Sequence, residues 1–394
     1  MDTDGSIWNN RRMRTDDKYR KTAEAINAAG GTPLPVTDTL IEILKLLIAE
    51  DELDFIIAFR DKRSQTLQQL LESTGLGEAE IKQRTAALAR RGIIFDQPNR
   101  KGIVVYRLLP LINVGIFEYM FMKKLERSER DREVADLFTR LFGEIRDLIQ
   151  ANYDPILASL DQWLPVDRTV PALDGTESGE PVTIQIDQTI EAPVDRVLPA
   201  QKVEEIIAKF DEIAVGHCFC RHHKDMMNSP CKQTKKRENC FTFGKSARYT
   251  SSQGFSRLVS RDEALKILRQ AEQDGLVHKA YHPNFDVSKE ETSICNCCKC
   301  CCLQSVANLI APTVNTTNYL ARVDPELCAG CGLCVEHCHT NAITVNADSK
   351  AEHVDSLCIG CGLCATHCPQ NAVSLFAGER IVRIPPSRRQ AAAG

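Results

Sequence analysis

The stretch LCAGCGLCVEHC at residues 327–338 returns thirty residues later as LCIGCGLCATHC, residues 357–368. Each copy spaces its four cysteines as C-x2-C-x2-C-x3-C. Thiolates spaced in this way can wrap one metal cluster, and glycines inside each loop remove the Cβ atoms that would block a close approach. An Asn-Ala pair and a β-branched stretch follow each copy. Each repeat is therefore predicted to form a strand, a cysteine loop, a short helix and a strand.

Over residues 320 to 377 the chain resembles the two-cluster bacterial ferredoxins. In that family the first three cysteines of one run share a [4Fe–4S] cluster with the last cysteine of the other run. Zinc knuckles are the alternative, although structural zinc normally takes paired C-x2-4-C units. His339 departs from the family, which usually has the proline seen at Pro369. The resemblance implies one cluster held by Cys328, Cys331, Cys334 and Cys368, and a second held by Cys338, Cys358, Cys361 and Cys364.

Ten further cysteines lie in two segments upstream of the repeats. One segment begins HCFCRHH at residue 217, and the other reads CNCCKCCC at residues 295–302. Ten thiols are too many for one mononuclear site, so we expect at least one further iron–sulfur cluster in this region. Structural zinc, redox-active disulfides and inert buried thiols are the alternatives. The predicted metal ligands are Cys218, Cys220, Cys231, Cys240, Cys295, Cys297, Cys298, Cys300, Cys301 and Cys302.

One helix is expected between these segments, and a second one is considered at the later segment. Residues 260–275 have a capping serine, Ser260, a glutamate three residues later and a terminating Gly275, and this helix would bring the two segments together. If residues 295–302 open a helix that runs to Ile310, Cys298 and Cys302 would share one of its faces.

The N-terminal part has the pattern helix, turn, helix, strand, polar loop, strand. From about Thr37 to Pro110 it resembles a winged helix of the MarR-like kind, with a DNA-reading helix at residues 78–91 and a wing at 97–101. Glu78 and Glu80 occupy the helical turn that normally enters the major groove, so DNA binding is the less favoured use of this domain. We expect it to dock proteins instead. Apolar residues at helical spacing in 111–165 indicate packing on this domain or on a second copy of the chain, as in a homodimer.

Composition restricts compartment and partners. The 394 residues carry a net charge of only −4, which indicates neither nucleic acid nor membrane as a partner. Eighteen cysteines in a long chain without a secretory segment favour metal sites over disulfides. The longest apolar stretch, residues 108–122, is too short and too interrupted to cross a bilayer. A cytoplasmic location is expected, and exposed low-potential clusters favour an anaerobic one.

These observations predict an α+β multidomain protein with a winged helix, a cysteine-rich middle domain and a two-cluster ferredoxin-like domain. No catalytic residue is predicted. The expected function is one-electron transfer to a partner oxidoreductase; a redox-sensing winged-helix transcription regulator and an oxidoreductase subunit with a catalytic middle-domain centre are alternatives. The predicted boundaries are 1–32 extension, 33–110 winged helix, 111–165 helical segment, 166–200 linker with a short strand, 201–319 cysteine-rich middle domain, 320–379 ferredoxin domain and 380–394 disordered tail.

Overall fold

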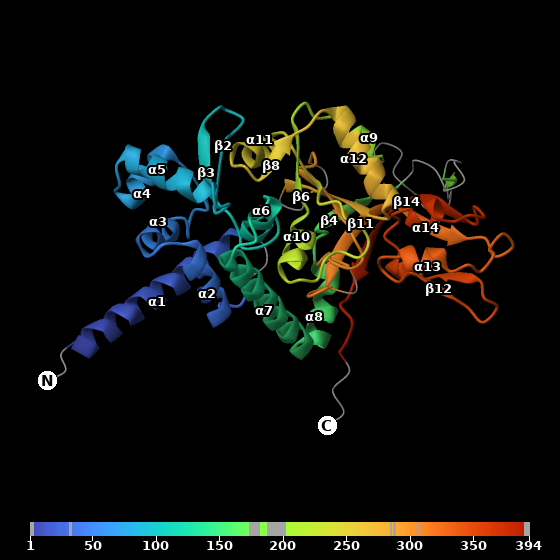
Figure 1. The fold of residues 1–394 in the computed structure, drawn as a ribbon, viewed down its shortest axis with the longest axis horizontal. Helices are drawn as coiled ribbons and strands as arrows, with labels where there is room; N and C mark the ends of the chain where they lie inside the picture. The colour runs from blue at the N-terminus through green and yellow to red at the C-terminus, as the bar shows by residue number, and fades with distance from the viewer. Residues whose placement is uncertain are drawn as a thin grey trace, which may run out of the picture. The chain divides into compact units, whose positions relative to one another are not determined.

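The computed structural model of the chain describes residues 4–30, 34–172, 182–186, 202–283, 286, 289–305 and 308–389, with side-chain environments from residue 15 onward. The chain divides into two units (Figure 1). The first contains residues 1–145 together with the short segments 226–228 and 249–256, and the second contains the rest.

The first unit is mostly helical and carries one small sheet. Local chemistry sets several of its helix ends: Thr66 and Gln69 cap each other at the start of α4, and Gly75 ends that helix at φ 68°. Its elements are α1 Asp4–Ala29, α2 Asp38–Leu47, η1 Glu50–Glu52, α3 Leu53–Ile57, β1 Ser64–Thr66, α4 Leu67–Thr74, α5 Glu78–Ala89, β2 Ile94–Pro98, β3 Val104–Leu108, α6 Ile116–Met122 and, up to residue 145, α7 Glu129–Ala151.

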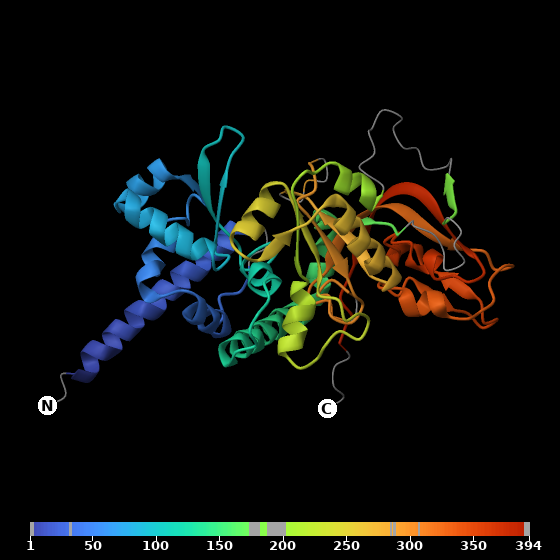
Figure 2. The same cartoon turned by 45° about the horizontal axis from the view of Figure 1, so that its top comes forward.

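The small sheet of this unit has the strand order β1-β3-β2 and is antiparallel. Strands β2 and β3 form a hairpin that stands out from α4 and α5 (Figure 2). Residues 249–256 complete the core, because the buried Tyr249 hydroxyl donates to the carbonyl of Ile94 at 2.9 Å and Phe255 stacks on Tyr119. A segment far along the chain is thus part of the N-terminal unit.

The second unit is built on a nine-stranded mixed sheet in the order β5-β14-β11-β4-β9-β10-β7-β6-β8. Its strands are β4 Asp167–Val170, β5 Ile184–Ile186, β6 Ile213–His217, β7 Glu238–Phe243, β8 Ser256–Leu258, β9 Val277–Tyr281, β10 Ser293–Cys297, β11 Thr313–Val323 and β14 Val373–Ile384. The hairpin β12 Ile343–Val345 and β13 Ala351–His353 stands apart. The helices of the second unit are α8 Tyr153–Ser159, η2 Leu160–Gln162, α9 Val203–Ala208, α10 Phe219–Met226, α12 Arg261–Gln273, α13 Leu333–His337, η4 Asp355–Leu357 and α14 Leu363–Thr366. Helix α11 Lys245–Ser252 begins in the second unit and ends in the first.

The large sheet joins the two cysteine regions. Strands β11 and β14 come from the C-terminal repeats, and β11 pairs in parallel with β4, which in turn pairs with β9 of the middle region. Helices α9 and α12 cover one face of the middle strands and form a core with residues such as Phe241 and Ile294. Because side chains alternate along a strand, Cys240 and Cys295 lie on the opposite face.

Three expectations about the backbone need correction. Residues 166–200 were expected to be a linker with a short strand. The short strand is β5, but residues 167–170 form a further, buried strand, β4, whose charged side chains pair with buried partners. Residues 173–181 and 187–200 lie outside the described residues. The helix considered for residues 295–310 does not form in the described residues, where 293–297 form a strand followed by turns. The disordered tail expected from residue 380 is wrong up to residue 389, because β14 runs to Ile384; residues 390–394 lie outside the described residues.

Other expectations hold. The helix expected at 260–275 is α12, and the Ser260 hydroxyl accepts from the Glu263 amide at 3.2 Å. Both repeats have the expected strand, loop, short helix and strand. Within the described ranges, no helix is both long and apolar enough to cross a membrane.

Candidate metal centres

The first ferredoxin set consists of Cys328, Cys331, Cys334 and Cys368. All four line one cavity between the loop of the first repeat and the end of the second. The second repeat thus supplies the fourth thiol to the first loop, which is the exchange that the resemblance implies. The sulfur of Cys328 accepts from the Ala351 amide at 3.5 Å, and that of Cys368 from the Ala372 amide at 3.3 Å. Such amide bonds stabilise negative sulfur and influence cluster potential.

The second ferredoxin set consists of Cys338, Cys358, Cys361 and Cys364. Burial, followed by the charges of Cys338 and Cys358, raises the pKa of Cys361 to about 12. Burial, followed by the charges of Cys361 and other thiols of this set, raises the pKa of Cys364, and the charge of Cys334 in the first set adds to the rise. Burial and neighbouring thiolates thus oppose the ionisation of Cys361 and Cys364, and a bound cation would offset both effects, which fits an iron–sulfur cluster.

The loop glycines allow this close packing. Gly360 has φ 60°, and a Cβ added there would lie 2.2 Å from the carbonyl oxygen of Tyr319. Its amide donates to the sulfur of Cys358 at 3.4 Å. The loop therefore needs glycine both for its backbone conformation and for the approach of strand β11.

His339, the departure from the ferredoxin pattern, is buried. Its Nε2 lies 3.3 Å from the carbonyl oxygen of Gly275, and burial lowers its pKa to about 4. At the position before the last cysteine of each repeat, His337 and His367 stack with ring centroids 3.8 Å apart. The two repeats thus contact each other through matching side chains.

The ten upstream cysteines separate into two groups. The first, here called the six-thiol group, lies on the face of the sheet opposite α9 and α12. The thiol of Cys240 on β7 forms hydrogen bonds with the thiols of Cys218 and Cys295. The thiol of Cys302 forms hydrogen bonds with those of Cys220 and Cys297. Cys295 and Cys297 are two residues apart on β10, so they share that face. The six members are Cys218, Cys220, Cys240, Cys295, Cys297 and Cys302.

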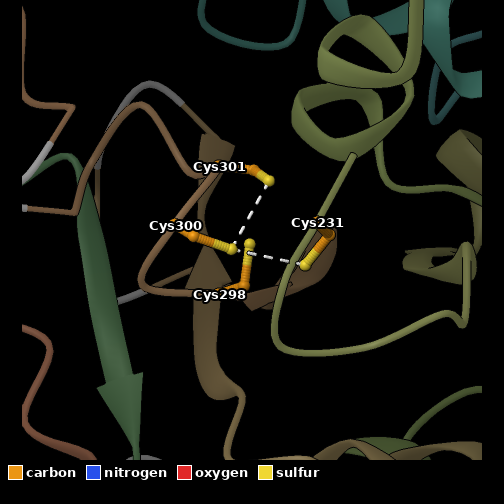
Figure 3. Close-up of side chains that lie close together, drawn as sticks. All are labelled: Cys231, Cys298, Cys300 and Cys301. Atoms are coloured by element: carbon orange, nitrogen blue, oxygen red, sulfur yellow. Dashed lines mark hydrogen bonds between the residues drawn. The ribbon is translucent and has the colours of Figure 1, made fainter. Parts of the chain in front are cut away.

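The second group, here called the four-thiol site, consists of Cys231, Cys298, Cys300 and Cys301. Figure 3 shows the four sulfur atoms directed toward one another, with Cys231 supplied by a separate loop. All four sulfurs lie within 4.8 Å of one another. Hydrogen bonds from Cys298 and Cys301 lower the pKa of Cys231, which favours its thiolate form. The helix on which Cys298 and Cys302 would share a face does not form in the described residues, and the two cysteines belong to different groups.

Two buried cations compensate the sulfur charge. Burial alone would lower the pKa of Arg221, but Cys218 of the six-thiol group and Cys298 of the four-thiol site raise it. Its guanidinium donates to the carbonyl of Asn296 at 3.0 Å and to the side chain of Asn239. Arg221 therefore holds a permanent positive charge near both groups.

The second cation, Lys279, was not foreseen from the sequence. Burial would lower its pKa, but Asp167, Cys297 and Cys302 raise it, and its Nζ lies 3.0 Å from the Asp167 carboxylate. A lysine between Val277 and Ala280, in a strand that also contains His278 and Tyr281, is the local signal that could have revealed it. Its partner Asp167 lies 112 residues away in the chain, so the pair could not be inferred without the fold.

Comparison with known families agrees with the C-terminal geometry. The model of the 4Fe-4S dicluster domain family matches residues 321–375, which include all eight cysteines of both repeats. The C-terminal region is thus an iron–sulfur dicluster domain. Neither the curated proteins nor the solved structures include a match to this chain. The cysteine-rich region upstream of the domain can bind metal as well, on the geometry of its thiols.

Proposed function

We propose that this protein is an electron carrier that passes single electrons through two [4Fe–4S] clusters and a third centre at the six-thiol group. The two ferredoxin sets would hold the clusters, which supply one-electron chemistry at potentials tuned by hydrogen bonding and exposure. No side chain is required to act as acid, base or nucleophile. The chain's own residues need only hold the centres close together and open one of them to a partner.

The observation that carries this proposal is the packing around Cys361. This ligand of the second ferredoxin set contacts the same apolar cluster as Cys295, Cys297 and Cys302 of the six-thiol group. Ile359 and Leu363, which flank it, are buried in that cluster. The second ferredoxin set therefore packs against the same apolar residues as the six-thiol group. On its other side, the charge of Cys334 in the first set raises the pKa of Cys364 in the second.

The cysteines of the first ferredoxin set and of the six-thiol group differ in their exposure to solvent. Cys331 of the first ferredoxin set is exposed, whereas Cys297 and Cys302 at the other end are buried. The neighbouring Leu327 is also exposed, at 54%. We propose that a partner oxidoreductase exchanges electrons at this exposed loop, in a reducing cytoplasm.

The test is iron, sulfide and EPR analysis of the anaerobically purified full chain. Wild-type protein should contain clearly more than the about eight irons of two cubes. Cys240→Ser should lose only the excess and keep the reduced ferredoxin-type signal. Cys331→Ser combined with Cys361→Ser should show the converse. About eight irons in wild type, unchanged in Cys240→Ser, would refute the third centre.

For the N-terminal unit, we propose a winged helix that docks a protein rather than DNA. The order of α3, β1, α4, α5, β2 and β3 supports the winged helix. On α5 the cations are already neutralised, since Lys82 pairs with Glu78 at 2.6 Å and Arg84 with Glu80 at 2.8 Å. Phosphate contacts would have to break these pairs, which weakens the regulator alternative. Salt-dependent, sequence-selective binding to duplex DNA would contradict this proposal.

One observation favours the enzyme alternative. A cavity in the second unit is bordered by cationic side chains from distant segments, and one of them, Lys299, is part of the cysteine-rich turn. Such a lining suits a small anionic substrate. A change in the visible or EPR spectrum on addition of one small carboxylate or phosphate, absent in Arg389→Gln, would support this activity. The lining includes Arg146, Gln150, Lys299, His339 and Arg389.

A further inference from the structure

The sulfur spacing of the four-thiol site distinguishes between kinds of metal centre. A zinc ion bound by four thiolates at about 2.3 Å in a tetrahedron places neighbouring sulfurs about 3.8 Å apart. In the structure, the Cys231 and Cys300 sulfurs are 3.5 Å apart and those of Cys300 and Cys301 are 3.6 Å apart. A [4Fe–4S] cube binds each thiolate to a different iron, so its ligand sulfurs stand further apart than this.

The other cysteines provide an internal comparison. Among the described residues, only Cys231, Cys298, Cys300 and Cys301 form a group of metal-ligand atoms that lie within 4.8 Å of one another. The first ferredoxin set instead surrounds a cavity. The thiols of the first set, inside the matched family domain, thus stand around a cavity, whereas those of the four-thiol site, upstream of the match, lie close together.

The site also joins three separate segments of the second unit. Cys231 lies in the loop after α10, and the other three ligands lie in the turn after β10. Within that turn, the Lys299 amide donates to the Gln233 side chain at 2.9 Å, and the Lys299 ammonium lies 3.2 Å from the carbonyl of Glu336 in α13. Fixing the turn therefore also fixes a contact to the ferredoxin repeat.

We propose that the four-thiol site binds a single tetrahedral zinc ion, separate from every iron–sulfur centre. The ion braces the turn at 298–301 against the loop at 231–237 and, through Lys299, against α13. This role goes beyond the proposed electron transfer and does not depend on it. Zinc suits such a brace because it has no redox chemistry and accepts four thiolates in a closed structural site.

The first test is metal analysis of full-length variants expressed with both iron and zinc in the medium. Wild-type protein should contain one zinc per chain, and Cys231→Ser combined with Cys301→Ser should lose it while keeping the iron of both ferredoxin sets. Cys240→Ser, the matched control from the six-thiol group, should retain zinc. Loss of zinc in Cys240→Ser but not in the double variant would overturn the assignment.

The second test uses wild-type protein and so does not depend on how a variant folds. X-ray absorption at the zinc edge should show four sulfur neighbours at about 2.3 Å and no nearby metal. Zinc-free protein whose Cys231→Ser variant loses iron and sulfide together would refute zinc and indicate a cluster. A lone iron at this site would equally refute zinc.

The brace itself is tested by hydrogen exchange. Zinc removal in the double variant should increase amide exchange in residues 231–237 and 298–305, with unchanged exchange in α12. Lys299→Met, which keeps all four ligands, should retain zinc but raise exchange in α13. Unchanged exchange in all of these segments would show that the ion does not brace the turn.

Discussion

Replacing Lys279 with methionine should destabilise the second unit strongly, because it leaves a buried carboxylate without its cation. The Asp167 side chain is fully buried and that of Lys279 is 4% exposed, with a separation of 3.0 Å. Removing one partner of a buried pair costs about 3–5 kcal/mol. Methionine keeps most of the apolar volume of the lysine side chain, so the lost free energy of unfolding comes from the removed charge and not from a cavity.

The assay is an anaerobic urea titration followed by circular dichroism and by visible cluster absorbance. With a slope of about 3 kcal/mol per molar, the midpoint should fall by about 1 to 2 M. The control is Lys289→Met, since Lys289 pairs with Asp286 at 2.8 Å while both side chains are 40% or more exposed. Such a surface pair contributes about 0–1 kcal/mol.

A second substitution checks the reasoning. Adding Asp167→Asn to Lys279→Met removes the stranded charge but keeps a partner for Asn315, so a large part of the lost midpoint should return. If Lys279→Met shifts the midpoint no more than Lys289→Met, or if the double variant is no better than the single one, the buried charge pair does not stabilise the unit as argued.

Two further predictions follow from the same kind of argument. Burial raises the pKa of Glu52, but bonds from Arg91 and the Ala49 amide lower it more, so the net pKa is below the ordinary value. The stabilisation that ionised Glu52 provides is complete above the ordinary pKa of glutamate and is lost as the pH falls through the lowered pKa of the folded state. The difference in melting temperature between wild type and Glu52→Gln should therefore be largest near neutral pH and shrink below about pH 4.5. A difference independent of pH would contradict this. Gly360→Ala should lower the iron content of the second ferredoxin set, because the new Cβ would lie 2.2 Å from a main-chain carbonyl oxygen. The control is Gly77→Ala, whose new Cβ would have no atom within 4 Å. Equal iron content in both variants would show that the loop does not need glycine.

Local patterns were sufficient for the repeats and for several helices. The doubled cysteine spacing predicts the dicluster domain because ligand spacing and loop glycines are properties of a few consecutive residues. The helix at 261–273 was predictable for the same reason, since Ser260 and Gly275 mark its ends. Strand β4 was not predictable, because Asp167 and Arg168 look like surface residues until their partners are known.

By itself, the sequence determined that the chain has eighteen thiols, eight of them in a two-cluster arrangement, and ten more in two segments. Only the tertiary structure decided how those ten divide. Strands β7 and β10 align Cys240 with Cys295 on one sheet face, while the turn after β10 redirects Cys298, Cys300 and Cys301 toward the distant Cys231. Pairing between strands and the folding of one loop onto another are long-range events, and neither is encoded in the spacing of neighbouring residues.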